Sequence, residues 1–222
     1  MHAAAPRSRR ALRFTMPESP AGRAGDRLYA IVLAGGASSR FGSPKQLVRI
    51  GGRPLLHTVV TRTAEVTGNA LIVVLGAGAA ELAPLLKHSP GSVVVNRQWR
   101  EGLASSIRAG IARLPASCAA VLLVLADQAA VTSDDLKRLA GTWRRRPQCI
   151  VAALYAGTTG APAIFPRSTF TELAALRGDS GARSILRRSA DRLVRVPMPT
   201  AELDLDTPED LLQFAPPQSE VP

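Results

Sequence analysis

The sequence predicts a single α/β domain of three layers, with a mostly parallel sheet between two layers of helices. Five apolar runs of strand length, rich in Val, Ile and Leu, alternate with four segments of helical pattern. Near-continuous hydrophobic strands separated by helices are typical of parallel sheets covered on both faces. The expected strands are 28–34, 70–75, 92–96, 119–126 and 149–155, and the expected helices are 55–67, 79–87, 103–114 and 133–145.

The second half of the domain is predicted from shorter and more mixed segments. No internal repeat and no convincing linker interrupts the chain, so one domain is expected from residue 28 to residue 214. Its further elements are expected as short strands at 162–165 and 193–197 and helices near 170–176, 182–188 and 210–214.

The two ends of the chain differ in composition from this domain. Residues 1–27 form a basic segment rich in Ala, Pro, Arg and Ser, and residues 215–222 also lack an apolar pattern. We expect both to be disordered tails. An arginine-rich, acid-poor start is also typical of an organelle transit peptide, whereas Met16 offers an alternative start of translation.

The composition indicates a folded protein without a membrane span. At 222 residues, with 46% hydrophobic residues, the chain can bury a sizeable core. No apolar stretch reaches the roughly 18 residues of a transmembrane helix, so we expect no membrane partner. Cys118 and Cys149 each begin an apolar run, which favours buried free thiols over a disulfide. Nothing indicates an oxidising compartment, and we expect a cytoplasmic location.

The formal net charge of +11 raises the hypothesis of a nucleic-acid partner. Residues 1–27 carry six arginines against two acidic residues, a net charge of +4, which leaves +7 on the rest of the chain. Aromatic residues make up only 4% of the sequence and show no stacking pattern beside the arginines. We therefore expect no nucleic-acid partner, and phosphate-rich substrates together with an arginine-biased composition account for the charge.

A glycine-rich segment directly follows the first expected strand and ends in two cationic residues. It reads LAGGASSRFGSPK over residues 33–45 and contains Gly35, Gly36 and Gly42. Glycines let main-chain N–H groups approach phosphate oxygens closely. Arg40 offers a planar fork of donors and Lys45 a compact point charge, so the segment predicts a cradle for a nucleotide's phosphates.

Other glycine-rich turns must be weighed against this interpretation. Any strand-to-helix turn can be rich in glycine. A Walker A loop is excluded because two residues separate Gly42 from Lys45 and Gln46 follows. The segment also lacks the G-x-G-x-x-G of a dinucleotide-binding fold, and residues 76–81 only approach that pattern, so we interpret them as an ordinary turn.

Two further places in the chain can carry chemistry. Asp127 closes the apolar run 121–126, where a carboxylate at a strand end can hold Mg²⁺, although it can equally be a turn or N-cap aspartate. Gly102, Ser105 and Ser106 begin the helix expected near residue 103, and their N–H and hydroxyl groups can meet a phosphate or base oxygen. The alternative is an ordinary serine-rich first turn. Trp99, just before, is expected to pack rather than to stack on a base.

The glycine-rich segment resembles the signature L-A-[AG]-G-x-S-x-R-[MF]-G-x-x-K of nucleotidyltransferases related to the molybdenum-cofactor enzymes. Further stretches are similar to the cytidylyltransferase branch of that family, in the same order between residues 28 and 214: NRQWREGLASSIRAGI, LADQ, GAPAIF, RGDSGARSIL and DLDTPEDL. Two departures stand out. This chain has LAGG, typical of the guanylyltransferases, in place of LAAG, and Ala129 replaces the proline of the Asp-Gln-Pro motif.

The resemblance implies a Rossmann-like domain similar to the nucleotide-diphospho-sugar transferases, and a Mg²⁺-dependent transfer of CMP from CTP to the molybdopterin cofactor, with release of pyrophosphate. Arg40, Lys45 and Asp127 would be catalytic, and Asp127 and Asp206 would bind the metal, with Asp206 preferred over Asp204. The nucleotide would contact Leu33, Ala34, Gly35, Gly36, Ser38, Ser39, Arg40, Gly42, Lys45, Gly102, Ser105 and Ser106. The acceptor would contact Gly160, Pro162, Asp179 and Arg183.

Several alternatives stay open at this point. The nucleotide could be GTP, and the acceptor could be a sugar phosphate or another small phosphate on the same fold. A reductase is disfavoured by the missing G-x-G-x-x-G. A cofactor-binding chaperone that serves a molybdoenzyme client is disfavoured because a carrier needs no triphosphate clamp. The transferase interpretation requires Lys45 and Asp127 to face one shared cleft.

Overall fold

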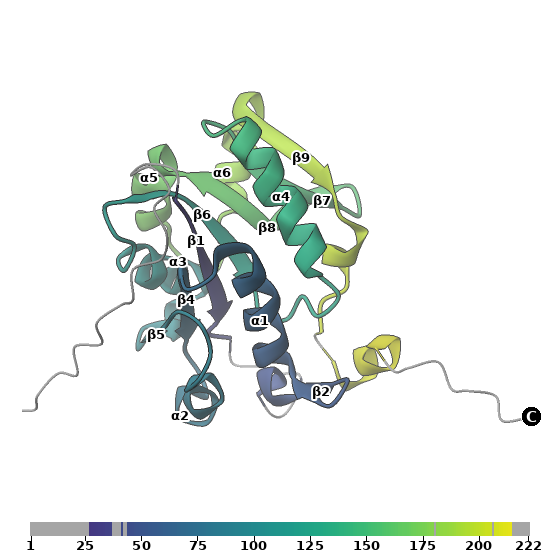
Figure 1. Ribbon diagram of the computed structural model, residues 1–222. Helices are drawn as coiled ribbons and strands as arrows, with labels where there is room; N and C mark the ends of the chain where they lie inside the picture. Colours follow the sequence, from purple (N-terminus) through teal and green to yellow (C-terminus); the bar gives the residue numbers. More distant parts are fainter. Residues whose placement is uncertain (1–26, 37–40, 42–43, 180, 206, 215–222) are drawn as a thin grey trace, which may run out of the picture.

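A seven-stranded sheet in the order β5-β4-β1-β6-β8-β7-β9 forms the centre of the molecule. The computed structural model describes residues 27–36, 41, 44–179, 181–205 and 207–214. Helices cover both faces of the sheet, and β5 and β9 lie at its two edges (Figure 1). The strands are β1 (Arg27–Ala34), β4 (Leu71–Leu75), β5 (Ser92–Val95), β6 (Cys118–Leu125), β7 (Ile150–Tyr155), β8 (Thr158–Pro166) and β9 (Leu193–Pro197).

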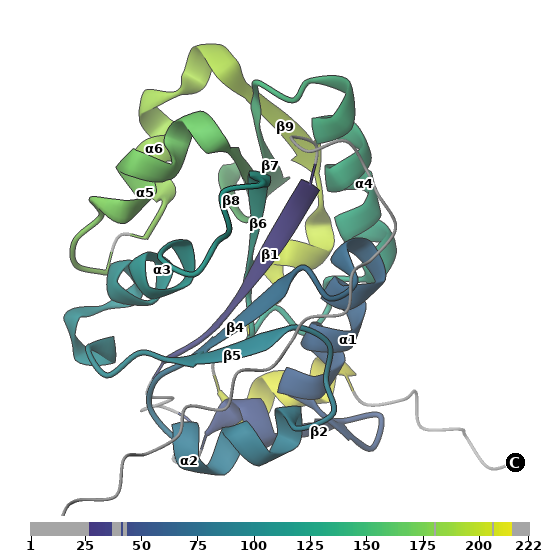
Figure 2. The ribbon, with the colours of Figure 1, turned by 60° about the vertical axis from the view of Figure 1, so that its left-hand side comes forward.

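The helices form two layers because the buried strands are apolar on both faces. In β1, Ala30 and Val32 face one hydrophobic cluster, and Ile31 and Leu33 face the other. The first cluster is covered by α1 (Leu55–Thr67), α2 (Ala79–Leu82) and α4 (Ser133–Arg145), and the second by α3 (Leu103–Ile111), α5 (Phe170–Ala174) and α6 (Arg183–Arg188). Figure 2 shows α3, α5 and α6 on one side of the sheet and α1 and α4 on the other. The predicted three-layer α/β domain is confirmed.

The sheet is mostly parallel, as predicted, but one strand runs against the others. β1 pairs in parallel with both β4 and β6, and β4 pairs in parallel with β5. Among the described strands of this sheet, β8 alone is antiparallel to its neighbours, β6 and β7, while β7 and β9 are parallel. The strand order reverses at β1, which has β4 on one side and β6 on the other. Ligands of α/β sheets bind at such a switch point.

The differences from the sequence prediction have local physical causes. The helix expected over 79–87 is divided into α2 and the 3₁₀ helix η2 (Ala83–Leu86), because Pro84 has no N–H to continue the first helix. The short strand expected at 162–165 is the last part of the longer β8, which forms a hairpin with β7. The helix expected at 210–214 is the 3₁₀ helix η7 (Pro208–Phe214). A small hairpin of β2 (Arg49–Ile50) and β3 (Arg53–Pro54) was not expected.

The remaining short segments are 3₁₀ helices that join the main elements. They are η1 (Lys45–Leu47), η3 (Trp99–Glu101), η4 (Arg167–Thr169), η5 (Ala190–Arg192) and η6 (Pro199–Glu202). No helix in the described ranges is long and apolar enough to cross a membrane. The predicted tails lie outside these ranges, except that Arg27 begins β1.

Both cysteines are free thiols, as expected. Cys118 is buried at the start of β6, and its thiol donates a hydrogen bond of 3.2 Å to the carbonyl of Ala120. Burial raises the pKa of this thiol to about 11, because a thiolate would lose its hydration there. Cys149 is only half-buried, so the expectation of burial holds fully for Cys118 alone.

Candidate active site

The candidate site lies at the carboxyl ends of β1, β4 and β6. Leu33 and Ala34 are buried at the end of β1, and the carbonyl of Leu33 accepts a 3.1 Å hydrogen bond from the N–H of Ala126 after β6. Gly35 follows β1 and is half-buried, and Gly36 is exposed. The predicted glycine-rich segment therefore leaves the sheet at its switch point.

Close backbone packing explains the glycines at two of these strand ends. A Cβ atom at Gly35 would lie 2.7 Å from the hydroxyl oxygen of Ser106 on α3. A Cβ atom at Gly76, just after β4, would lie 2.5 Å from the carbonyl oxygen of Gly35 and 2.7 Å from Cβ of Trp99. Since real Cβ atoms do not approach other atoms so closely, the two strand ends and the start of α3 can converge only with glycine at both positions.

Lys45 and Asp127 meet at this edge of the sheet. Nζ of Lys45 donates a hydrogen bond of 2.7 Å to Oδ2 of Asp127, although 82 positions separate the two residues. The side chains are 12% and 25% exposed, respectively, so the ion pair is largely shielded from solvent. Asp127 follows Ala126 just beyond the end of β6, and its carbonyl accepts a 3.0 Å bond from the N–H of Leu205. Lys45 and Asp127 therefore meet, while their catalytic roles stay predictions.

One oxygen of Asp127 has no hydrogen-bond partner in the part of the chain that the structure describes. Within the described residues, Oδ1 of Asp127 is buried and meets no hydrogen-bond donor, while Oδ2 is held by Lys45. A buried carboxylate oxygen without a donor is costly unless a cation or another ligand satisfies it. A hard divalent cation fits this oxygen donor. The described residues contain no cluster of three or more His, Cys, Asp or Glu side chains, so further ligands would have to come from elsewhere, such as phosphates.

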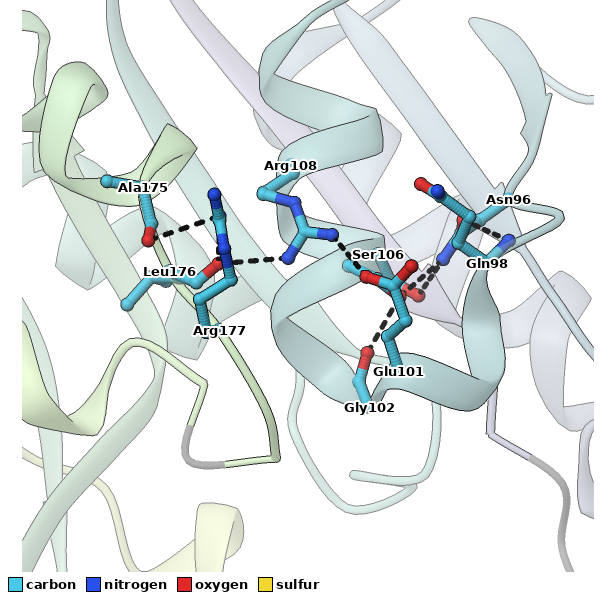
Figure 3. Close-up of polar contacts among 10 residues, drawn as sticks. Asn96, Gln98, Glu101, Gly102, Ser106, Arg108, Ala175, Leu176 and Arg177 are labelled. Atoms are coloured by element: carbon cyan, nitrogen blue, oxygen red, sulfur yellow. Dashed lines mark hydrogen bonds and ion pairs between the residues drawn. The ribbon is translucent and has the colours of Figure 1, made fainter.

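The start of α3 is built on internal hydrogen bonds (Figure 3). The side-chain amide of Asn96 donates to the hydroxyl oxygens of Ser105 at 2.8 Å and Ser106 at 3.1 Å, and all three residues are buried. The hydroxyl of Ser105 in turn donates to the carbonyl of Gly102 at 2.8 Å. The hydroxyls therefore fix the turn, and a direct contact with a nucleotide stays a prediction. Trp99 packs its Cβ against the Gly76 position, and the Arg100 guanidinium lies 4.4 Å from the centre of its ring.

Charged side chains join this turn to the loop before α6. Arg108 on α3 donates to Glu101 at 2.6 Å and to the carbonyl of Leu176 at 2.9 Å (Figure 3). The same carbonyl accepts a 2.9 Å bond from Arg177. In the same region, Gly102 lies so close to Asp179 that a Cβ atom at Gly102 would collide with the carboxylate. A residue predicted for the nucleotide and one predicted for the acceptor are therefore neighbours.

A pocket of about 450 Å³ opens between the sheet and the helices α3 and α6. Its interior is mainly apolar, and it includes Leu33 and Leu125 from the strand ends that carry Gly35 and Asp127. Its wall comprises Leu33, Leu103, Ile107, Leu123, Leu125, Tyr155, Ala161, Ala163, Phe165, Asp179, Gly181, Ala182, Arg183, Leu186, Arg187 and Asp204.

The four residues predicted for the acceptor divide into two groups. Asp179 and Arg183 are part of the pocket wall. Gly160 and Pro162 are buried in β8, and the alternate residues of this strand, Ala161 and Ala163, are part of the pocket wall. Of the four, only the two charged residues line the pocket, and a contact of Gly160 or Pro162 with the acceptor stays a prediction.

Two residues of this region were not assigned a role from the sequence. Gln128, only 1% exposed, donates through Nε2 to the carbonyls of Ala161 at 2.9 Å and Ala201 at 3.0 Å. It therefore joins the turn after β6 to β8 and η6. Its Oε1 is buried without a partner among the described residues. The only sequence signal for Gln128 was its place after Asp127 in LADQ.

The second residue is Tyr155, the last residue of β7. Its hydroxyl occupies the space where a side chain of Gly160 would lie. Burial raises the pKa of Tyr155, and the carboxylates of Asp204 and Asp127 raise it further, whereas the charge and hydrogen bonding of Arg183 lower it. An isolated tyrosine after an apolar run gave no signal of this role.

Five of the predicted site residues lie outside the described residues. They are Ser38, Ser39, Arg40, Gly42 and Asp206. Their assignments to the nucleotide and the metal stay predictions.

Comparison with known proteins agrees with this architecture. A family model described as "MobA-like NTP transferase domain" matches residues 30–193. The chain is 29% identical over 167 residues to nicotine blue oxidoreductase of Paenarthrobacter nicotinovorans, which covers 71% of this chain and 80% of that protein. It is also 29% identical over 137 residues to the bifunctional protein GlmU of Sorangium cellulosum, which covers 58% of this chain but only 29% of that longer protein.

Solved structures show the same fold. Rv0371c from Mycobacterium tuberculosis superposes with a TM-score of 0.75 at 28% sequence identity, covering 85% of this chain and 96% of that one. A structure of Rv0371c in complex with manganese gives a TM-score of 0.71 at 26% identity, covering 85% and 97%. That protein therefore binds manganese.

Proposed function

The chain belongs to the MobA-like NTP transferase family of nucleotidyltransferases, and on this premise we propose that it transfers CMP from CTP to the molybdopterin cofactor with release of pyrophosphate. The reaction depends on Mg²⁺ in this proposal. Transfer of GMP from GTP to the same acceptor is the alternative that the LAGG sequence at residues 33–36 favours.

The observation that carries the proposal is the Lys45–Asp127 pair at the switch point of the sheet, beside the pocket. Nucleotidyl transfer brings an anionic acceptor oxygen against the α-phosphorus of an anionic triphosphate, so charge repulsion is the main obstacle. Positioned cations reduce this repulsion, and no covalent group of the protein is required. In this proposal Lys45 neutralises phosphate charge, and Asp127, its neighbour at 2.7 Å, holds the metal ion.

The residues present fit a divalent cation. The unpartnered Oδ1 of Asp127 supports a metal ligand at this position, and Asp206, outside the described residues, is the second proposed ligand. Bound Mg²⁺ would stabilise negative charge on the phosphates. Lys45, now paired with Asp127, would turn its ammonium group to the β- and γ-phosphates, together with Arg40, and so stabilise the departing pyrophosphate.

The pocket supports a heterocyclic acceptor. Its interior carries Leu, Ile, Phe and Ala side chains, while Arg183 and Arg187 add positive charge to its wall. A flat ring system gains from apolar contact, and its phosphate gains from the guanidinium groups. A sugar phosphate would instead need many polar partners for its hydroxyls, so the pocket favours the pterin over a sugar-phosphate acceptor.

The test is a panel of nucleoside triphosphates assayed for pyrophosphate release with Mg²⁺ and either molybdopterin cofactor or a sugar 1-phosphate. We expect release with CTP and molybdopterin cofactor only. Preference for GTP would reassign the base, and release only with the sugar phosphate would reassign the acceptor. Tight binding of the cofactor without release would instead support a carrier that serves a molybdoenzyme client.

A second candidate function is a reductase, favoured by the 29% identity with nicotine blue oxidoreductase over 167 residues. Oxidation of NAD(P)H in the presence of an aromatic electron acceptor would reveal it. The turn at residues 76–78 leads from β4 to α2 without the third glycine of a dinucleotide-binding loop, so we expect no such oxidation.

A further inference from the structure

We propose that Arg62 is a positioning residue for the nucleotide side of the site: it holds the turn at residues 127–131 and thereby fixes the place of Asp127. The inference rests on the proposed function, because that function assigns Asp127 to a divalent cation. Arg62 acts in it through the backbone of the turn rather than by touching a substrate.

The guanidinium of Arg62 extends from α1 to the turn that follows β6. Its Nη1 donates a hydrogen bond of 2.7 Å to the carbonyl of Ala129 and one of 2.9 Å to the carbonyl of Val131. Ala129 and Val131 are buried, at 3% and 4% exposed. Buried carbonyl groups are costly to leave without a donor, and a charged donor forms stronger hydrogen bonds than a neutral one. Arg62 therefore restrains this turn strongly.

The turn's own hydrogen bonds hold it less firmly. The N–H of Val131 donates to the carbonyl of Gln128 at 3.3 Å, and the N–H of Gln128 donates to that of Leu125 at 3.4 Å. Both distances are longer than the usual value of about 2.9–3.0 Å. A shorter bond of 2.8 Å runs from the N–H of Ala129 to the carbonyl of Asp127. A shift of Ala129 is therefore passed directly to the proposed metal ligand.

The same helix also holds the segment of Lys45. The N–H of Leu55, the first residue of α1, donates a 2.7 Å bond to the carbonyl of Val48, which directly follows the 3₁₀ helix η1 that begins at Lys45. Arg62 lies about two helical turns further along α1. One rigid element thus contacts the segment of the cation at its start and the turn of Asp127 further along. Arg62 is the side chain that sets the second of these contacts.

The effect of Arg62 is expected on the nucleotide side and not on the acceptor side. Gln128, in the same turn, donates to the carbonyls of Ala161 in β8 and Ala201 in η6. Arg62 instead joins the turn to α1, and within the described residues α1 contributes nothing to the wall of the acceptor pocket. The two side chains therefore tie one turn to two different parts of the molecule.

Binding of Mn²⁺ to the full chain, measured from the electron paramagnetic resonance of the free ion, tests the proposal without any transfer reaction. The binding that Asp127→Asn abolishes defines the site. Arg62→Met removes both hydrogen bonds and should weaken Mn²⁺ binding there on the order of tenfold, as for other residues that orient a metal ligand. Charge alone acts in the opposite direction, because loss of a nearby cation strengthens the binding of Mn²⁺. Unchanged or tighter binding by Arg62→Met would overturn the proposal.

Two further variants separate positioning from a general loss of stability. Arg167→Met is the matched control, since Arg167 donates a 3.0 Å bond to the carbonyl of Cys118 at the other end of β6. It should lower the thermal midpoint and leave Mn²⁺ binding unchanged. Arg62→Lys keeps a charged donor and should recover most of the affinity. Equal losses of affinity in Arg62→Met and Arg167→Met, or no recovery in Arg62→Lys, would contradict a role of these hydrogen bonds in placing Asp127.

The transfer assay distinguishes this inference from the proposed function. Arg62→Met should raise the Mg²⁺ concentration that gives half-maximal pyrophosphate release, with the KM for molybdopterin cofactor close to wild type. A rise in that KM alone would place Arg62 on the acceptor side and refute the inference. If the wild type transfers no nucleotide while Arg62→Met still weakens Mn²⁺ binding, the proposed function is wrong and the positioning role stands. If transfer occurs and Arg62→Met binds Mn²⁺ normally, the inference alone is wrong.

Discussion

The two sides of the candidate site are built in different ways. On the nucleotide side, β1, β4 and β6 are parallel, and glycines let their ends converge with the start of α3 at distances that exclude a Cβ atom. On the acceptor side, the antiparallel strand β8 and the helix α6 form a pocket whose character comes from side chains such as Tyr155 and Arg183. The backbone therefore defines the first side and the side chains define the second.

The acceptor side should therefore tolerate substitutions better than the nucleotide side. In the proposed function, the main chain at these strand ends contacts the part of the substrate that all nucleotides share, and a side chain added at Gly35 or Gly76 would disturb it. A pocket formed by side chains can change its acceptor through a few substitutions. The family membership of this chain together with its diverse relatives, which include an oxidoreductase and GlmU, is consistent with that division.

The largest effect is expected from removing the cation of the nucleotide side. Lys45→Ala should lower turnover on the order of 10²-fold, as for the loss of one charge-stabilising group in other enzymes. The fold should persist, which circular dichroism can confirm. The matched control is Lys137→Ala, since Lys137 is 49% exposed and pairs with Glu65 and Asp134 at the surface. Normal turnover by Lys45→Ala would mean that the nucleotide side has been placed wrongly.

Adding one methyl group should distinguish the two sides further. Gly76→Ala places Cβ 2.5 Å from the carbonyl oxygen of Gly35, so we expect the free energy of unfolding to fall by about 1–3 kcal/mol. Gly36→Ala, whose Cβ would have no neighbour within 4 Å among the described atoms, should leave stability unchanged. Urea denaturation measures both. Equal stability of the two variants would contradict the idea that backbone convergence defines this side.

The junction between the sides depends on Gln128. Gln128→Leu leaves the carbonyls of Ala161 and Ala201 without their donor, which should lower stability by roughly 1–3 kcal/mol. The KM for the acceptor should rise more than the KM for the nucleotide, because Ala161 belongs to the pocket wall. Gln213→Leu, at an exposed glutamine, serves as the control. A selective rise in the nucleotide KM would place Gln128 on the other side of the division.

The smallest effect is expected from the hydrogen bonds that cap the start of α4. Asp135 caps α4 through Thr132 and accepts a 2.9 Å bond from Thr200 in η6. Burial alone would raise the pKa of Asp135, but the hydrogen bonds from Thr132 and Thr200 and the charge of Arg138 lower it below its usual value. The carboxylate therefore stabilises the fold at neutral pH, and this contribution is lost as the pH falls through the folded-state pKa.

Asp135→Asn should accordingly lower the free energy of unfolding by about 1 kcal/mol at neutral pH. The difference from wild type should shrink in acid, as urea denaturation at neutral and acidic pH can show. Asp134→Asn, at a side chain that is 87% exposed, provides the comparison. A difference that grows in acid would show that the pKa of Asp135 is raised rather than lowered.

Local sequence signals predicted the long strands and helices of the molecule well. The strands at 28–34 and 119–126 and the helix at 133–145 are apolar or amphipathic over enough residues to be recognised without any partner. The hairpin of β2 and β3 and the full length of β8 were missed, because their residues become strands only when a neighbouring strand pairs with them.

The sequence by itself determined the layered α/β domain, the glycine-rich turn after the first strand and the presence of Lys45 and Asp127 at element ends, because these depend on neighbouring residues. Only the tertiary structure decided that Lys45 binds Asp127, that Asn96 engages the two serines, and that Tyr155 fills the space at Gly160. Pairings such as that of Lys45 with Asp127, 82 positions apart, depend on how the sheet orders its strands. No local pattern of residues carries that information.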